Sequence, residues 1–258
     1  MKLELLDLDS LETWHSDFQD LVYQQDIWLK IEAKLDAAPP QGEEFLSQIT
    51  CAPEYQRDEL AKLLRHKARE ILFLRYSHVA GYHGCRVRDE NQYRLGGIFP
   101  SNTSALISEA RTLFADIQGF EEALQDIAPW YLSHNEGKVG LLFSCIRAKD
   151  DRNAYTGGSE LIRSLANRLG SEAKLRFAQT GRRSLIKCAI PIEWLENHTT
   201  LPVIGSFSNN VLEHLIRRRK WPEGNFVGFD GAYMLTRAVP SENILEFIDM
   251  TDFSDDDQ

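Results

Sequence analysis

The chain lacks paired cysteines and long apolar runs. Its four cysteines, Cys51, Cys85, Cys145 and Cys188, are far apart, form no CxxC pair and lie in or near apolar segments. This spacing favours buried free thiols over disulfides or a zinc site, so we expect a cytoplasmic protein without a bound metal. No apolar run is long enough for a transmembrane span, and the N-terminus, MKLELLDLDSLETW, lacks a secretory signal's basic start and small-residue cleavage site. We therefore expect no membrane partner.

Excess positive charge and a dinucleotide fingerprint are also missing. The formal net charge is −10, which argues against a surface coated for bulk nucleic-acid binding but leaves room for a local basic groove. No GxGxxG sequence occurs, which disfavours a Rossmann dehydrogenase. With 258 residues, 43% of them hydrophobic, the chain is long enough for one large domain or a domain with an appendage.

Hydrophobic periodicity places helices first and strands with intervening helices later, an order that predicts an α+β fold. We expect an N-terminal helical region over 1–75, an α+β domain over 76–251 and an acidic, disordered tail over 252–258. Predicted helices cover 10–35, 54–74, 91–95, 103–116, 121–127 (ending before Pro129), 161–169 and 208–220. Predicted strands cover 79–87, 138–146, 184–191, 226–229, 233–236 and 245–250.

The segment Val79–Pro100 is one of two stretches with chemical character. It begins as a short buried strand that carries His83 in the sequence YHGCR. Gly84 removes side-chain bulk beside the imidazole, which suits the approach of a flat or phosphorylated ligand. A buried core histidine is the alternative interpretation.

The second stretch is Tyr155-Thr156-Gly157-Gly158-Ser159-Glu160, at the start of a predicted helix. The glycines free the backbone, Ser159 is a helix cap, and N–H groups there suit an anion. Tyr155 could lie against an aromatic ring, and Glu160 could hold a ribose hydroxyl or orient a nucleophile. The alternative interpretation is an ordinary turn and cap.

The two stretches, together with Gly97-Ile98 between them and a C-terminal VPSENI turn, resemble the order of motifs in the ADP-ribosyltransferase-like superfamily. The resemblance covers roughly residues 79–250 and leaves residues 1–75 outside. It implies a split antiparallel-sheet core, here with an added N-terminal helical layer. The implied activity is transfer of ADP-ribose from NAD to a macromolecular acceptor, without a metal.

The resemblance also implies residue roles. His83 would contact the NAD ribose, and Tyr155 would stack on nicotinamide. The implied cofactor-binding residues are Tyr82, Gly84, Cys85, Arg86, Tyr93 and Ser159. For Arg86 the physical reason is that its planar guanidinium matches phosphate oxygens.

The family's third catalytic residue, often a glutamate on a later strand, has no clean counterpart. Within EGNFVGFDGAYM the chain offers Glu223 and Asp230, and Glu160 of the second stretch is the other candidate. Exposed loop carboxylates are the alternative interpretation of Glu223 and Asp230. A degenerate site that binds without catalysing is a further possibility.

The acceptor is open between a protein and a nucleic acid. Arg217, Arg218, Arg219 and Lys220 lie beside Trp221, a pattern that suits phosphate and base contact but also an ordinary solvated helix end. The resemblance further implies a toxin or antiviral defence effector, held in some cases by an antitoxin protein. The alternative to an enzyme is a non-catalytic α+β module that docks a protein or RNA.

Overall fold

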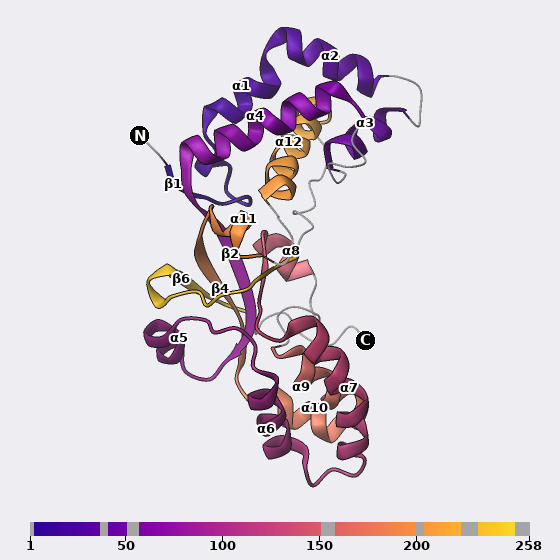
Figure 1. Cartoon of the computed structure of the whole chain (residues 1–258), viewed down its shortest axis with the longest axis vertical. Coiled ribbons are helices and arrows are strands. Elements are labelled where there is room, and N and C mark those ends of the chain that lie inside the picture. The colour runs from indigo at the N-terminus through magenta and orange to yellow at the C-terminus, as the bar shows by residue number, and fades with distance from the viewer. Residues whose placement is uncertain are drawn as a thin grey trace. The chain divides into compact units, whose positions relative to one another are not determined.

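The computed structural model describes residues 3–36, 41–50, 57–150, 158–199, 204–222 and 232–250. It confirms a mixed α+β fold with a six-stranded sheet (Figure 1). The chain divides into two compact units. Unit 1 comprises Met1–Val79, Pro191–Asn197 and Leu201–Phe229, and unit 2 comprises Ala80–Ile190, His198–Thr200 and Asp230–Gln258.

The sheet has the order β5-β3-β2-β4-β6, with β1 beside β2. Its strands are β1 (Leu3–Leu6), β2 (Tyr76–Val87), β3 (Val139–Leu142), β4 (Arg182–Pro191), β5 (Ala232–Leu235) and β6 (Ile244–Asp249). The pairs β2–β3, β3–β5 and β4–β6 are antiparallel, whereas β1 runs parallel to β2. Because β2 is central, the YHGCR residues lie inside the sheet and not at its edge. The strand predicted over 226–229 lies outside the described residues.

Unit 1 is helical. Its described helices are α1 (Ser16–Tyr23), α2 (Gln25–Leu35), α3 (Gln41–Thr50), α4 (Glu59–Arg75), α11 (Trp194–Asn197) and α12 (Ile204–Lys220), with a 3-10 turn, η1 (Leu11–Thr13). The α4 helix begins at Asp58, whose side chain accepts hydrogen bonds from the backbone N–H groups of Leu60 and Ala61, both 3.0 Å. Helix α12 packs against α4 within unit 1, whereas the strands that precede and follow it in sequence belong mainly to unit 2. The predicted boundary at residue 75 therefore differs from the division into units.

The single helix predicted over 10–35 is wrong. Three shorter elements occupy this range, because His15 and Gln24 have extended ψ angles of 143° and 131°. The Nδ1 atom of His15 accepts a hydrogen bond from the Asp17 N–H at 3.1 Å and so starts α1. Histidine is not among the preferred cap residues, which is why the break was missed.

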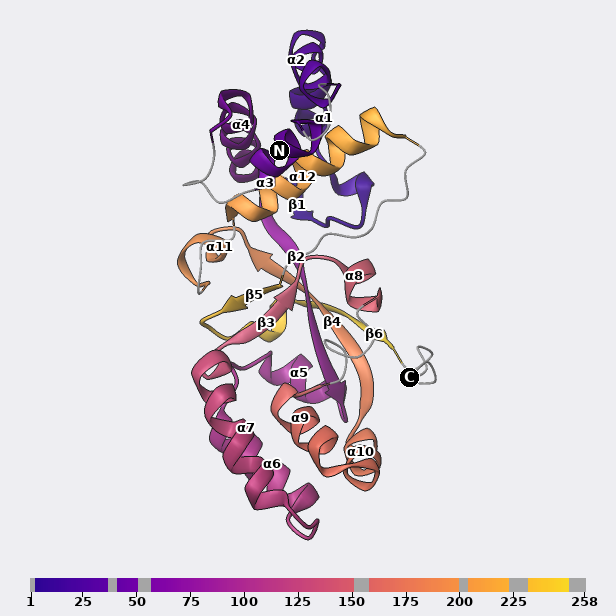
Figure 2. The ribbon, with the colours of Figure 1, turned by 90° about the vertical axis from the view of Figure 1, so that its right-hand side faces the viewer.

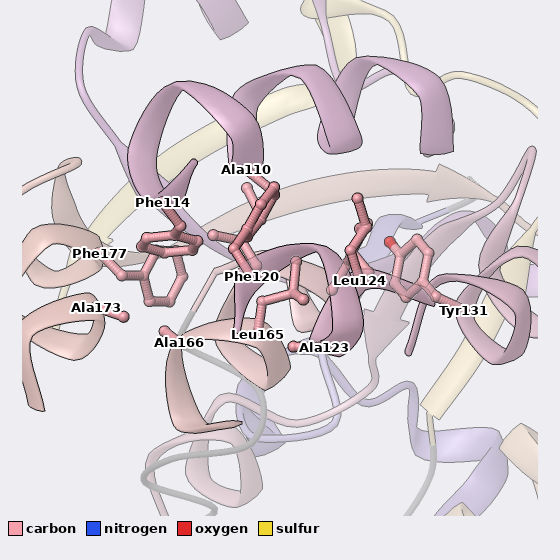
Figure 3. Close-up of a cluster of buried hydrophobic side chains, with 12 residues drawn as sticks. Ala110, Phe114, Phe120, Ala123, Leu124, Tyr131, Leu165, Ala166, Ala173 and Phe177 are labelled. Atoms are coloured by element: carbon pink, nitrogen blue, oxygen red, sulfur yellow. The ribbon is translucent and has the colours of Figure 1, made fainter. Parts of the chain in front are cut away.

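Unit 2 carries the remaining described helices: α5 (Glu90–Gly96), α6 (Thr103–Phe114), α7 (Phe120–Asn135), α8 (Cys145–Asp150), α9 (Glu160–Leu169) and α10 (Ser171–Ala178), with the turn η3 (Ser241–Asn243). Helices α6, α7, α9 and α10 lie side by side (Figure 2). Their shared core is built around Phe114, Phe120, Leu165 and Phe177, all nearly or fully buried (Figure 3).

Two further expectations for unit 2 are wrong, and one of its helices was not expected. Helix α7 does not end before Pro129 but continues to Asn135, and burial of Tyr131 and Asn135 beyond the proline offsets the lost backbone hydrogen bond. The strand predicted over 138–146 ends at Leu142, and α8 begins at Cys145. Helix α10 was not predicted, nor were β1 and α3 of unit 1. Within the described ranges, no helix has the length and apolar character needed to cross a bilayer.

A buried histidine makes the stability of unit 1 depend on pH. His214 on α12 is 7% exposed, and its ring packs edge-on against Trp14 with centroids 4.9 Å apart. Burial, with a smaller contribution from the charge of Arg218, lowers the pKa of His214 from 6.5 to about 4. The unfolded chain therefore binds more protons than the folded chain between these two values, and stability falls as the pH falls through this window.

We expect the free energy of unfolding of unit 1 to fall by up to about 3 kcal/mol as the pH is lowered from 6.5 to 4. Most of the decrease that is due to His214 should occur above pH 5, before carboxylates titrate. Urea unfolding at a series of pH values measures it. In His214→Gln the slope between pH 6.5 and 5 should flatten, whereas His66→Gln, at an exposed site on α4, should retain it. Equal slopes in the two variants would contradict the assignment.

Candidate functional site

His83 is held in one orientation on β2. Its Nδ1 atom lies 2.9 Å from the carbonyl oxygen of Gly140 on β3. Since a carbonyl only accepts, Nδ1 carries the hydrogen and Nε2 is the ring's acceptor. Burial lowers the pKa of His83, and the bond to Gly140 opposes this only in part. The imidazole is therefore neutral at pH 7, and its Nε2 atom is the one able to accept a hydrogen bond from a ligand.

A cleft of about 410 Å³ opens beside His83, entirely within unit 2. Its walls come from β2, α5, the N-terminal turns of α6 and α9, the end of α7, and β3 and β5. Seven of the residues proposed from the sequence line it: His83, Gly84, Cys85, Arg86, Tyr93, Ser159 and Glu160. The structure thus brings two motifs that are far apart in sequence to one cavity.

The last turn of α7 positions the first turn of α9. The Nδ2 atom of Asn135 lies 3.3 Å from Oε2 of Glu160 and donates to it. One turn earlier, the Tyr131 hydroxyl donates to Oγ of Ser101 at 3.2 Å. Both α7 residues are buried, so the contact of Asn135 fixes where the Glu160 carboxylate lies on the cleft wall.

Arg86 on β2 holds the turn between α10 and β4. Its Nη1 donates to the carbonyl oxygens of Ala178 at 3.0 Å and Gly181 at 2.9 Å. The guanidinium also lies over the Phe177 ring, 4.9 Å from its centroid. Arg86 does line the cleft, but these contacts assign its Nη1 to holding the turn between α10 and β4, which the phosphate-binding prediction did not anticipate.

Cys85 and Tyr93 both line the cleft. Burial raises the pKa of the Cys85 thiol to about 12, and burial likewise raises the pKa of Tyr93. Both groups are protonated at neutral pH. Cys85 is thus a lining residue and not a thiolate nucleophile.

Not every predicted residue lies in the cleft. Tyr82 is 2% exposed and is not among the residues that line the cleft; the Lys187 ammonium lies 5.9 Å from its ring centroid. Tyr155, Glu223 and Asp230 lie outside the described residues.

The basic end of α12 is used within unit 1. Arg217 pairs with Glu213 at 2.7 Å, and Lys220 pairs with Asp36 at 2.7 Å. The guanidinium of Arg219 lies 4.7 Å from the ring centroid of Tyr23 and 4.2 Å from that of Trp28. These contacts favour the solvated, structural interpretation for three of the cations. Arg218 and Trp221 are exposed, with Trp221 at 44%.

Sequence reasoning missed Tyr131, Asn135 and Phe99. The first two are four residues apart, on one face of a helix that was expected to end before Pro129. Phe99 lines the cleft and belongs to the Val79–Pro100 stretch, but no role was predicted for its side chain from the sequence.

Comparison of the chain with protein-family models, with curated proteins and with solved structures finds no match. Among the residues that the structure describes, no group of three or more histidine, cysteine or acidic side chains is placed to hold a metal ion.

The close packing around Gly158 predicts that an alanine there destabilises the protein. Its φ is +89°, and a β-carbon there would lie 3.0 Å from Cγ of Arg86 and 3.3 Å from the Phe177 ring. Gly119, with φ +87°, has nothing within 4 Å of the same position. Gly119→Ala should cost about 1 kcal/mol from backbone strain alone, and Gly158→Ala about 1–3 kcal/mol more from the clash. Urea unfolding compares them, and equal costs would show that Gly158 is not tightly packed.

Proposed function

We propose that unit 2 binds NAD in this cleft and transfers ADP-ribose to a macromolecular acceptor. The observation that supports the proposal is the convergence on one cavity of a neutral, oriented imidazole, His83, and a positioned carboxylate, Glu160. These are the residue types that the resemblance to ADP-ribosyltransferase-like proteins implies. Tyr155 would complete the site, five residues before Glu160.

The chemistry matches these groups. The bond between C1′ of the ribose and the nicotinamide nitrogen breaks, and nicotinamide leaves as a neutral molecule with the bonding electron pair. A nucleophile of the acceptor forms the new bond to C1′, and its proton passes to Glu160. The Nε2 atom of His83 accepts a hydrogen bond from a ribose hydroxyl, and the Glu160 carboxylate stabilises positive charge that develops on the ribose.

Labelled NAD tests this activity. We expect wild-type protein to incorporate label from the ADP-ribose half into cell extract, and protease and nuclease treatment to identify the acceptor class. His83→Ala and Glu160→Gln should each lower turnover by about 100-fold or more, because each removes a group that acts on the reacting ribose.

The matched control is Glu122→Gln, at an exposed position on α7, which should leave turnover unchanged. Urea unfolding of each variant shows whether the fold is retained. NAD turnover that both site substitutions leave intact would rule the proposal out. Binding of NAD without turnover would identify the chain as the non-catalytic module instead.

A further inference from the structure

Phe99 is an exposed aromatic residue at the cleft. It lines the cavity, yet 69% of its surface is open to solvent. An exposed phenylalanine on its own is ordinary, but one that lines a cavity offers a flat apolar surface to a ligand that enters. The question is whether the ring is held in place or merely lies on a loose loop.

The segment that carries Phe99 is pinned on both sides. Before it, Ile98 exchanges two backbone hydrogen bonds with Val239, of 2.8 and 2.9 Å. After it, the Ser101 N–H donates to the Lys138 carbonyl oxygen at 2.9 Å, and the Gly137 N–H donates to the Ser101 carbonyl oxygen at 2.9 Å. The backbone that carries the ring is therefore fixed, so a ligand does not have to order this segment when it binds.

Gly97 makes this mounting possible. Its φ is +82°, and a β-carbon there would lie 2.3 Å from the Val239 carbonyl oxygen. Only glycine permits this close approach. On the preceding residue, a β-carbon at Gly96 would lie 3.3 Å from the Phe99 ring, so the ring edge lies close to Gly96.

We propose that Phe99 is the stacking platform for the adenine ring of the dinucleotide, an inference that rests on the proposed function. NAD carries two flat rings. Its nicotinamide is expected beside Ser159, the N-cap residue of α9. Phe99 belongs to a different segment, between α5 and α6, so it is available to the second ring. Stacking would cover the exposed face of Phe99 with an aromatic surface.

Calorimetric titration of the full chain with AMP, ADP-ribose and nicotinamide mononucleotide tests the assignment. Phe99→Ala should weaken binding of AMP and ADP-ribose by roughly 10- to 100-fold and leave nicotinamide mononucleotide unchanged. Phe99→Trp should retain the affinity for AMP. Leu95→Ala is the matched control, since Leu95 is 84% exposed on α5, four residues before Phe99, and is not among the residues that line the cleft.

AMP affinity that Phe99→Ala leaves unchanged would overturn the inference, as would an equal loss of affinity for nicotinamide mononucleotide. If the wild-type protein turns over NAD and Phe99→Ala has the same KM for NAD, the stacking role is wrong but the proposed transfer is not. Wild-type protein that binds AMP through Phe99 but never turns over NAD would defeat the proposed transfer alone. A wild-type chain that binds none of the three nucleotides overturns both.

Discussion

The contact of Arg86 with Phe177 is the interaction on which the cleft depends. Arg86 lies on the strand that carries His83, and Phe177 lies on α10, so their contact joins the sheet to the helical core of unit 2. The same guanidinium holds the turn into β4 through two carbonyl oxygens. Gly158, at the start of α9, packs against both side chains. Loss of the contact would release several walls of the cavity together.

A second set of buried contacts positions the side of the cleft that α7 and α9 form. Asn135 on α7 donates a hydrogen bond to Glu160 on α9, while the hydrophobic core between these helices fixes their spacing. Buried polar groups of this kind stabilise one arrangement strongly, because an unpaired alternative is costly. The hydrogen bond to the Gly140 carbonyl oxygen fixes the orientation of the His83 ring in the same way. The imidazole and the carboxylate therefore meet the cavity from independent supports.

Local patterns were enough to predict most of β2 from its apolar residues, and α5 and α9 from the polar residues at their starts, Asp89 and Ser159. They were also enough to nominate His83, Ser159 and Glu160, which share the cleft. The partners of Arg86 could not be predicted, since the carbonyl groups it binds are 92 and 95 residues away. The exposure of Phe99 likewise depends on a backbone approach between Gly97 and Val239 that no local pattern reveals.

Two further differences follow from tertiary packing. Helix α7 continues through Pro129 because residues beyond it are buried, which outweighs the local breaking tendency. The basic end of α12 looked like a nucleic-acid contact, yet carboxylates and aromatic rings of unit 1 take up most of its charge. Charge runs are therefore weaker guides to function here than the convergence of distant motifs.

The most direct measurement is a crystal structure of the protein with ADP-ribose. A single molecule should occupy the cleft of unit 2, with a ribose hydroxyl within hydrogen-bond distance of Nε2 of His83 and the Glu160 carboxylate facing the same ribose. Density for the ligand in any other place, or a ribose that touches neither side chain, would contradict the assignment of this cavity as the dinucleotide site.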